Sequence, residues 1–448
     1  MSVALIILAA GKGTRMKSDL PKVLHPIAGA PMLHHAMRAG AVLEPAHTVV
    51  VAGFGADAVR ASVAEFDATA QVVVQADQLG TAHATQQAQQ ALSGFDGRAI
   101  IVFGDTPFVR PEKLQSLAES PADVTVLGFE AADPGRYGRL VMDGDQLERI
   151  VEFKDATDAE RAITLCNSGV LAAPAPLLFD LIAEVGNENA QGEYYLTDLP
   201  QLARARGLSV AVTHCAEAET LGINSRAELA GADTQFQAMT RRAAMEDGVT
   251  MAAPDTVYFS FDTVVGRDAL IEPNVVFGPG VTVESGATIR AFSHLEGCHV
   301  SRGAIVGPYA RLRPGAELAE DVRVGNFVEI KNATLAEGAK VNHLSYIGDA
   351  SVGEASNIGA GTITCNYDGV MKHRTEVGAR AFIGSNTMLV APVSVGDEAM
   401  TGSGSVITSD VEEGALAIAR APQVEKPGMA RKLFEMLKAK KARMSRGS

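Results

Sequence analysis

Residues 265–294 consist of five consecutive units of six residues: VGRDAL (Val265–Leu270), IEPNVV (Ile271–Val276), FGPGVT (Phe277–Thr282), VESGAT (Val283–Thr288) and IRAFSH (Ile289–His294). Each unit begins with a large apolar residue that can point inward, and small residues near the second and fifth places permit a tight corner. Three units make a triangular coil of 18 residues, and coils stack at the ~4.8 Å spacing of neighbouring strands. The period predicts a parallel β-helix from about Val265 to Ile407.

The repeat is interrupted at a few defined places. Its phase slips by one residue near Val300, Leu335 and Val352, and the period is lost between Thr364 and Glu376, where the sequence is TCNYDGVMKHRTE. A segment without the period cannot follow the prism wall. We therefore expect it to form a loop that projects outward.

The first half of the chain has a different pattern, in which strand-like runs alternate with longer helix-like segments. This alternation is typical of an α/β domain with a mostly parallel sheet. The expected strands are Val3–Leu8, Thr48–Val51, Val72–Val74, Ala99–Phe103 and Val124–Phe129.

We predict three parts: an α/β domain over residues 1–226, a linker helix over 227–247, and a hexapeptide-repeat domain with a tail over 248–448. The tail sequence MARKLFEMLKAKKARM (Met429–Met444) favours a basic helix that packs on the end of the prism rather than a membrane anchor.

Composition limits the classes of function. The chain has 448 residues, 47% hydrophobic and 21% charged, as in soluble globular proteins of more than one domain. A net charge of -14 argues against non-specific binding to nucleic acid or anionic lipid. The four cysteines are widely spaced, no basic segment precedes the first apolar run, and no run is long enough to span a membrane, so we expect a cytoplasmic location.

A first group of polar residues follows the strands of the α/β half. The first strand is followed by AAGKGTRM (Ala9–Met16) and LPK (Leu20–Lys22), which combine a glycine-rich turn with cations, and Asp105 follows another strand. The turn lacks the third glycine of a Rossmann fingerprint and the Ser/Thr of a P-loop. A tight turn and a helix-capping aspartate are the simpler interpretations. The combination instead favours phosphate binding, with Asp105 as a ligand of Mg²⁺.

A second group of polar residues lies on the prism. Arg313 and Lys331 are one coil apart, so their charges should lie about 5 Å from each other at a cost below ~1 kcal/mol in water. They form either an anion site or a solvated basic edge. His343, with Tyr346 three residues later, is suited to act as a general base at neutral pH. A lone surface histidine, such as His294 or His299, is usually inert.

Six ordered motifs in the first half resemble sugar-1-phosphate nucleotidyltransferases: LAAGKGTRM with LPK, QADQLGT, FGD, YGR, VEFK and NSG. The resemblance implies that a sugar-phosphate oxygen attacks the α-phosphate of UTP and releases pyrophosphate. It implies catalytic roles for Arg15 and Lys22, and Mg²⁺ on Asp105 and Asn224. The implied nucleotide and sugar site comprises Leu8, Ala9, Ala10, Gly11, Lys22, Gln75, Gly80, Thr81, Phe103, Gly104, Asp105, Gly138, Glu152, Asn167 and Asn224.

The second half extends the resemblance over nearly the whole chain. Its motifs PYARLRPG, VGNFVEIK, NHLSYIGD, NIGAGTITCNYDG and IGS look like those of the bifunctional bacterial N-acetylglucosamine-1-phosphate uridylyltransferases and glucosamine-1-phosphate acetyltransferases. That family implies a left-handed, trimeric prism with an acetyl-transfer site between subunits. Its substrates would be glucosamine 1-phosphate, acetyl-CoA, N-acetylglucosamine 1-phosphate and UTP, and it would bind neither nucleic acid nor membranes.

The same resemblance implies roles for individual residues of the prism. His343 would take the amine proton of the acetyl acceptor. The sugar phosphate would be bound by Arg313, Lys331, Tyr346, Asn357 and Lys372, and acetyl-CoA by Ala360, Asn366, Tyr367, Ser385, Ser403 and Arg420. Two positions depart from the family pattern, Phe103 where tyrosine is common and Ser403 where alanine is common.

Two alternatives compete with a bifunctional enzyme. One is a sugar nucleotidyltransferase whose β-helix serves only assembly, and the other is a non-catalytic subunit of similar domain composition. The grouping of His343, Arg313 and Lys331 with the outward loop argues against the first. The presence of Gly11, Arg15, Lys22 and Asp105 argues against the second.

Overall fold

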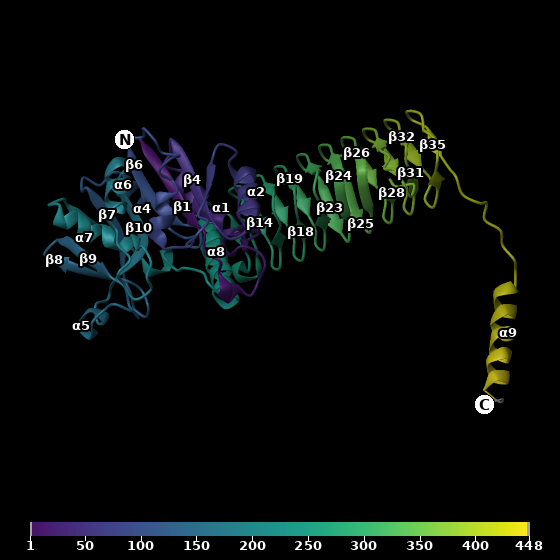
Figure 1. The fold of residues 1–448 in the computed structure, drawn as a ribbon. Coiled ribbons are helices and arrows are strands. Elements are labelled where there is room, and N and C mark those ends of the chain that lie inside the picture. Colours follow the sequence, from purple (N-terminus) through teal and green to yellow (C-terminus); the bar gives the residue numbers. More distant parts are fainter. Residues whose placement is uncertain (1, 446–448) are drawn as a thin grey trace. The chain divides into compact units, whose positions relative to one another are not determined.

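The computed structural model describes residues 2–445. Residue 1 and residues 446–448, the outer ends of the first and last predicted domains, lie outside the described residues. Contacts divide the chain into two compact units, Met1–Thr240 and Arg241–Ser448. Several elements of each unit are labelled in Figure 1.

The first unit is built on a mostly parallel sheet in the order β11-β7-β10-β6-β1-β4-β5, in which β10 runs antiparallel to its neighbours. The expected strands are confirmed. The strands are β1 (Val3–Ala9), β4 (His47–Ala52), β5 (Gln71–Val74), β6 (Arg98–Phe103), β7 (Val124–Glu130), β10 (Leu165–Pro174) and β11 (Val210–Cys215), with the hairpin β8 (Arg139–Asp143) and β9 (Gln146–Val151) beside β10 and the short pair β2 (Pro26–Ile27) and β3 (Ala30–Pro31).

Both faces of this sheet are buried. Along β1, alternate side chains enter two different hydrophobic clusters, as the two-residue period of a strand requires. One face is covered by α1 (Met32–Ala41), α2 (Ala56–Phe66) and α4 (Pro111–Ala118), and the other by α3 (Thr81–Gln86), α6 (Ala175–Ile182) and α7 (Leu199–Ala205). The short helices are η1 (Thr14–Met16), η2 (Lys22–Leu24), α5 (Asp158–Arg161), η3 (Leu196–Asp198) and η4 (Glu217–Glu219).

Helix α8 (Arg226–Glu246) runs through the division between the two units. Its first half belongs to the α/β unit, where Asp233 Oδ1 accepts a 2.8 Å hydrogen bond from the amide of Ala28 and the ring of Phe236 meets His35 edge-on at 5.4 Å. Ala244, near its end, packs on the apolar core of the prism.

The second unit is a prism of parallel strands, which confirms the fold predicted from the period of six (Figure 1). The large first-place residues, such as Ile271, Ile289 and Val306, are fully buried in a single core. The short helix η5 (Pro254–Thr256) lies near the start of this unit. One sheet consists of β12 (Thr250–Met251), β14 (Leu270–Ile271), β17 (Thr288–Ile289), β20 (Ile305–Val306), β23 (Arg323–Asn326), β25 (Lys340–His343), β27 (Asn357–Ile358), β30 (Phe382–Ile383), β33 (Met400–Thr401) and β35 (Leu416–Ala417).

A 14-stranded sheet forms the rest of the prism, because the long strands β24 and β26 each pair with strands on two faces. Its strands are β13 (Val264–Val265), β15 (Val276–Phe277), β16 (Thr282–Val283), β18 (His294–Leu295), β19 (Cys298–Val300), β21 (Arg311–Leu312), β22 (Ala316–Leu318), β24 (Glu329–Leu335), β26 (Tyr346–Val352), β28 (Ile363–Cys365), β29 (Thr375–Val377), β31 (Met388–Val390), β32 (Val393–Val395) and β34 (Val406–Ile407).

The predicted phase slips are coils that are one residue short. Val283 pairs with Val300, and Leu335 pairs with Leu318 on one side and Val352 on the other, so each step is one residue less than 18. Val352 then pairs with Val377, which confirms the inserted loop between β28 and β29. The loop is exposed at Tyr367, Val370 and Met371.

The tail contains the predicted helix, α9 (Met429–Met444), but the predicted packing on the prism is wrong. No residue of α9 is buried. The stretch before it is exposed and contains Pro422 and Pro427, and Lys440 interrupts the apolar stripe of Met429, Leu433 and Met436, which leaves little surface to bury. Within residues 2–445 no helix is long and apolar enough to cross a membrane.

Candidate active sites

The first site is a cavity of about 310 Å³ at the carboxyl ends of β1 and β6, the edge at which open α/β sheets bind ligands. The glycine-rich loop after β1 forms one wall. Gly13 has a left-handed φ of 62°, and a Cβ there would lie 2.6 Å from Cβ of Lys22, so only glycine lets Lys22 come this close. Ten predicted residues line the cavity: Leu8, Ala9, Ala10, Gly11, Lys22, Gln75, Gly80, Thr81, Phe103 and Asp105.

Three polar side chains from distant parts of the chain meet at this cavity. The ammonium of Lys22, on η2, forms an ion pair with Asp105 after β6 and donates a 3.0 Å hydrogen bond to Oδ1 of Asn224. The amide of Ile223 donates to the carbonyl of Asp105 at 3.1 Å, which holds the loop of Asn224 against the end of β6. Two oxygen ligands therefore converge on one cation.

Not every predicted residue reaches this cavity. Arg15 lies exposed on η1, and neither Arg15 nor Gly104 is among the lining residues. The lining also includes Gln78 and Glu193, which sequence reasoning missed. Gln78 belongs to the quoted QADQLGT motif, and its side-chain amide donates a 2.7 Å hydrogen bond to the carbonyl of Ala10.

A second cavity of about 310 Å³ shares Thr81 and Phe103 with the first and contains the three predicted sugar-binding residues, Gly138, Glu152 and Asn167. The amide of Asn167 donates to the carbonyl of Gly138 at 2.8 Å. Burial raises the pKa of the Glu152 carboxyl, although the hydroxyl of Thr197 donates a 3.3 Å hydrogen bond to it. The two cavities are suited to the two halves of one sugar nucleotide.

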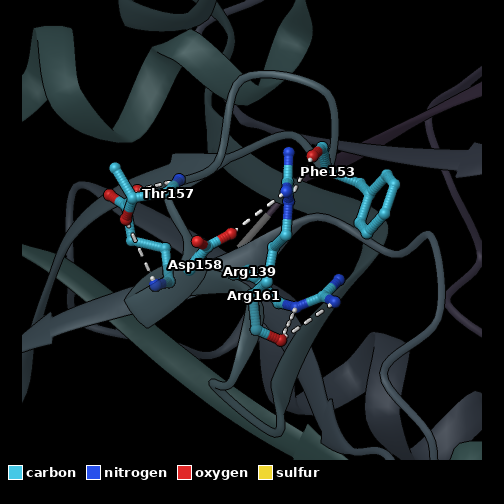
Figure 2. Close-up of polar contacts among 6 residues, drawn as sticks. Arg139, Phe153, Thr157, Asp158 and Arg161 are labelled. Carbon is cyan, nitrogen blue, oxygen red and sulfur yellow. Dashed lines mark hydrogen bonds and ion pairs between the residues drawn. The ribbon is translucent and has the colours of Figure 1, made fainter.

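A buried arginine lies next to Gly138 of the second cavity, and its contact with Arg161 is drawn in Figure 2. Arg139 follows Gly138 directly, is 2% exposed, and donates to the carbonyls of Gly135, Tyr137 and Arg161. The guanidiniums of Arg139 and Arg161 lie 5.8 and 5.0 Å from the ring centre of Phe153, the residue after Glu152.

The helix that carries Arg161 is itself held by a capping box. Thr157 Oγ1 accepts a hydrogen bond from the amide of Glu160, and Glu160 accepts one from the amide of Thr157. The backbone around Gly138 and Glu152 is thereby held from both sides. The TxxE pattern that begins at Thr157 indicates a capping box from the sequence alone, whereas no sequence pattern indicates that the Arg139 side chain is buried.

The prism carries the other site, which begins at His343. This histidine is two residues beyond the inward-pointing Val341 of β25. A cavity of about 220 Å³ beside it is lined by Arg290, Ile305, Gly307, Pro308, Arg323, Val324, Gly325, Asn326, Asn342 and His343. Nδ1 of His343 lies 2.9 Å from Oδ1 of Asn326 on the preceding coil.

The predicted phosphate-binding cations are close in space. Leu312 pairs with Ile330, so Arg313 and Lys331 occupy neighbouring coils, as predicted. Arg313 also donates a 2.8 Å hydrogen bond to Glu329, a partner that sequence reasoning missed. Lys372, from the outward loop, meets Lys331, and this neighbouring ammonium lowers the pKa of Lys372.

A buried carboxylate lies beneath these cations. Asp349 accepts a 2.6 Å hydrogen bond from Nδ2 of Asn332 and a second hydrogen bond from the amide of Asn366, and both bonds lower the pKa of its carboxyl against the effect of burial. Nδ2 of Asn366 also lies 3.5 Å from the hydroxyl of Tyr346. Predicted sugar and acetyl-CoA residues thus share one hydrogen-bonded network.

The remaining predicted residues form a column. Backbone carbonyls of the column accept hydrogen bonds from the next coil. The backbone amides of Gly361, Asn386 and Gly404 donate to the carbonyls of His343, Ala360 and Ser385, in that order. The guanidinium of Arg420 donates to the carbonyl of Ser403. His343, Ala360, Ser385 and Ser403 each lie two residues beyond the inward residue of a strand, on β25, β27, β30 and β33. The three coil steps of ~4.8 Å from His343 to Ser403 span about 14 Å. The column fits an elongated ligand, and Asn357 begins strand β27 beside it.

Comparison with known proteins agrees with this two-part arrangement. Residues 5–179 match the model of the MobA-like NTP transferase domain, and residues 262–297 match that of the bacterial transferase hexapeptide (six repeats). The chain is 70% identical to the Bifunctional protein GlmU of Ruegeria sp. (strain TM1040) over 100% of both chains, and 68% identical to that of Roseobacter denitrificans over 100% of both. The protein of the same name from Ruegeria pomeroyi is 70% identical over 99% of both chains.

Proposed function

Because the chain belongs to the family of bifunctional GlmU proteins, we propose that each of its two sites carries one of the two transfer reactions of UDP-N-acetylglucosamine synthesis. The chain is an enzyme of two activities that acts on a sugar phosphate, acetyl-CoA and UTP. Acetyl transfer to glucosamine 1-phosphate precedes uridylyl transfer to N-acetylglucosamine 1-phosphate. The observation that carries this conclusion is full-length similarity to relatives named as bifunctional, which argues against both a single activity and a non-catalytic subunit.

We assign uridylyl transfer to residues 1–226, the connection to 227–247 and acetyl transfer to 248–448. A phosphate oxygen of N-acetylglucosamine 1-phosphate attacks the α-phosphorus of UTP in line, and the bond to pyrophosphate breaks. The protein contributes mainly position and charge. Lys22 and Arg15 neutralise the triphosphate, and the cavity of Gly138, Glu152 and Asn167 orients the sugar.

The family implies a divalent metal ion, which we propose is Mg²⁺. Asp105 and Asn224 offer a carboxylate and an amide oxygen, the hard oxygen ligands that Mg²⁺ prefers, and both already converge on the ammonium of Lys22. The ion, when bound, would neutralise charge that develops on the phosphates. Two protein ligands suffice, since Mg²⁺ in such sites is also bound by substrate phosphates and waters.

In acetyl transfer, the amine nitrogen of glucosamine 1-phosphate attacks the thioester carbonyl of acetyl-CoA while the imidazole of His343 accepts its proton. The C–S bond then breaks and CoA leaves. Arg313, Lys331 and Lys372 would bind the phosphate, and Tyr346 and Asn357 the sugar. The column of Ala360, Ser385, Ser403 and Arg420, with Asn366 and Tyr367 beside it, would bind acetyl-CoA.

We further propose that the protein is located in the cytoplasm and assembles as a homotrimer.

Incubation with glucosamine 1-phosphate, acetyl-CoA, UTP and MgCl₂ should yield CoA, pyrophosphate and UDP-N-acetylglucosamine in equal amounts. Liquid chromatography with mass detection would follow all three products. If UDP-N-acetylglucosamine forms only from added N-acetylglucosamine 1-phosphate, with no release of CoA, the prism has no acetyltransferase activity and the single-activity alternative is right.

The metal proposal predicts that Lys22→Met tightens metal binding by the protein without nucleotide while it impairs uridylyl transfer. The ammonium now lies on the two oxygens that would bind the ion, and a neighbouring positive charge about 4 Å away opposes binding of the ion by ~1 kcal/mol or more even in water. Mn²⁺ affinity, measured by electron paramagnetic resonance, should rise about 10-fold.

Lys12→Met is the matched control, because the Lys12 ammonium lies over the ring of Phe54 at 5.7 Å rather than on a carboxylate. Its Mn²⁺ affinity should equal that of the unaltered protein. Equal affinity in Lys22→Met would mean that Lys22 does not occupy the metal position.

A further inference from the structure

His343 has a neighbour in its column to which no role has been assigned. Asn326, at the end of β23, pairs in register with His343, at the end of β25. The amide of Leu344 donates a 3.1 Å hydrogen bond to the backbone carbonyl of Asn326, and the side chains meet with Oδ1 of Asn326 2.9 Å from Nδ1 of His343. Backbone and side chain therefore bind the two residues together.

The close stacking of these two coils leaves the pair little freedom. A Cβ on Gly325, the residue before Asn326, would lie 1.9 Å from the carbonyl oxygen of Asn342, the residue before His343. Glycine at this point lets the two backbones approach each other. This close approach places the side-chain amide of Asn326 beside the imidazole of His343. The contact is a product of the coil geometry rather than a chance meeting of surface side chains.

An amide oxygen has no proton, so the proton shared between these two atoms must belong to Nδ1 of the imidazole. In neutral histidine one ring nitrogen carries the proton and the other carries a lone pair, and the hydrogen bond made by one nitrogen decides the state of the other. With Nδ1 protonated, Nε2 has the lone pair. Nε2 is the atom that can accept a proton from a substrate.

The charged residues among those that line the cavity beside His343 are cations. Arg290 and Arg323 line the same cavity, Lys340 begins the strand of His343, and β27 on the other side contributes the uncharged Asn357. A carboxylate at Nδ1 would stabilise the imidazolium and raise the pKa of the ring. A neutral amide selects the tautomer without favouring the charged form.

We infer that Asn326 is a positioning residue for acetyl transfer, which holds His343 as the Nδ1–H tautomer so that Nε2 faces the acceptor amine. The inference rests on the proposed role of His343 as base. As the N–C bond forms, Nε2 takes the amine proton and Asn326 keeps its hydrogen bond to Nδ1–H of the imidazolium. When the C–S bond breaks, the thiolate of CoA takes the proton back from Nε2.

The tautomer itself gives a test that does not depend on activity. In full-length protein with ¹³C/¹⁵N-labelled histidine, the His343 signals, assigned by their loss in His343→Ala, should show a protonated Nδ1 and an unprotonated Nε2 at alkaline pH. Asn326→Ala should give a mixture of tautomers. A protonated Nε2 in the unaltered protein would overturn the inference, because the side-chain amide of Asn326 would then present its nitrogen to the ring.

The pH profile of acetyl transfer gives the second test. Asn326→Ala should lower kcat by about 10- to 100-fold, the range known for groups that orient metal-bound histidines, and leave the KM for acetyl-CoA unchanged. Asn326→Asp should move the acidic limb of kcat/KM to higher pH by about one unit, because a carboxylate beside Nδ1 favours the imidazolium and more alkaline conditions are needed to free Nε2. Activity of this variant should recover as the pH rises, whereas that of Asn326→Ala should stay low.

Two controls separate positioning from damage to the fold. Uridylyl transfer by the same preparations reports the integrity of the chain. Glu284→Ala removes another histidine contact between coils, from Nε2 of His299 to Oε1 at 3.0 Å, and should leave acetyl transfer unchanged.

The outcomes also separate this inference from the function on which it rests. Retained acetyl transfer in His343→Ala would refute the base itself. If His343→Ala is inactive but neither Asn326 variant changes kcat or the acidic limb, His343 remains the base and the role of Asn326 is refuted.

Discussion

Replacement of His343 by alanine is expected to reduce acetyl transfer by about 10²- to 10⁴-fold and to leave uridylyl transfer intact. A positioned general base contributes an acceleration of this order, because the amine must lose a proton as it attacks the thioester. His343 is the first residue of the proposed acetyl-CoA column, and its own backbone carbonyl accepts a hydrogen bond from the amide of Gly361. The measurement is the rate at which N-acetylglucosamine 1-phosphate forms, followed by chromatography.

His294→Ala is the matched control for this experiment. His294 is also an exposed histidine in a strand of the prism, on β18, but it lines neither the cavity beside His343 nor the column. Its removal should change neither activity. Full acetyl transfer in His343→Ala would mean that the amine loses its proton to another group or to water, and the assignment of the base would fail.

Replacement of Asp105 by alanine is expected to reduce uridylyl transfer by about 10²- to 10³-fold or more while acetyl transfer continues. The substitution removes the only carboxylate that meets Lys22 among the described residues, and with it one of the two oxygen ligands of the proposed Mg²⁺ site. Loss of one preorganised electrostatic contact to a developing charge usually costs 10²- to 10³-fold. Pyrophosphate release measures the rate, and Mn²⁺ titration of the same variant should show weakened binding.

Asp145→Ala provides the comparison, because Asp145 is exposed in the turn between β8 and β9, away from both cavities of the first unit. Unchanged pyrophosphate release in Asp105→Ala would exclude Asp105 from the reaction. If uridylyl transfer fell but Mn²⁺ affinity did not, Asp105 would instead act through its ion pair with Lys22.

The sequence predicted the prism well because its period is a direct physical requirement. Every sixth residue must enter the core, so the phase could be followed from Val265 onward and its slips marked where coils are short. The same counting predicted that Arg313 and Lys331 lie on neighbouring coils. It also located the outward loop, since residues between Thr364 and Glu376 cannot keep the phase.

Contacts that depend on the third dimension were beyond this reasoning. The sequence did not show that the outward loop returns Lys372 to Lys331, that Glu329 pairs with Arg313, or that Lys22 meets Asp105 and Asn224. Each of these contacts depends on the direction in which a side chain points. The repeat period specifies only whether a residue of the prism is buried and on which coil it lies. The packing of α9 was predicted wrongly for a related reason, because an amphipathic pattern does not specify a receiving surface.

The stacking of coils determines the spacing of the residues in the column from His343 to Arg420. Its residues lie on coils that are joined by backbone hydrogen bonds. The distances between these residues along the prism axis are therefore multiples of one strand spacing. Successive residues of the column are thus spaced by ~4.8 Å along the prism. Gain or loss of a whole coil would therefore change the length of the column by ~4.8 Å and leave the surroundings of His343 unaltered.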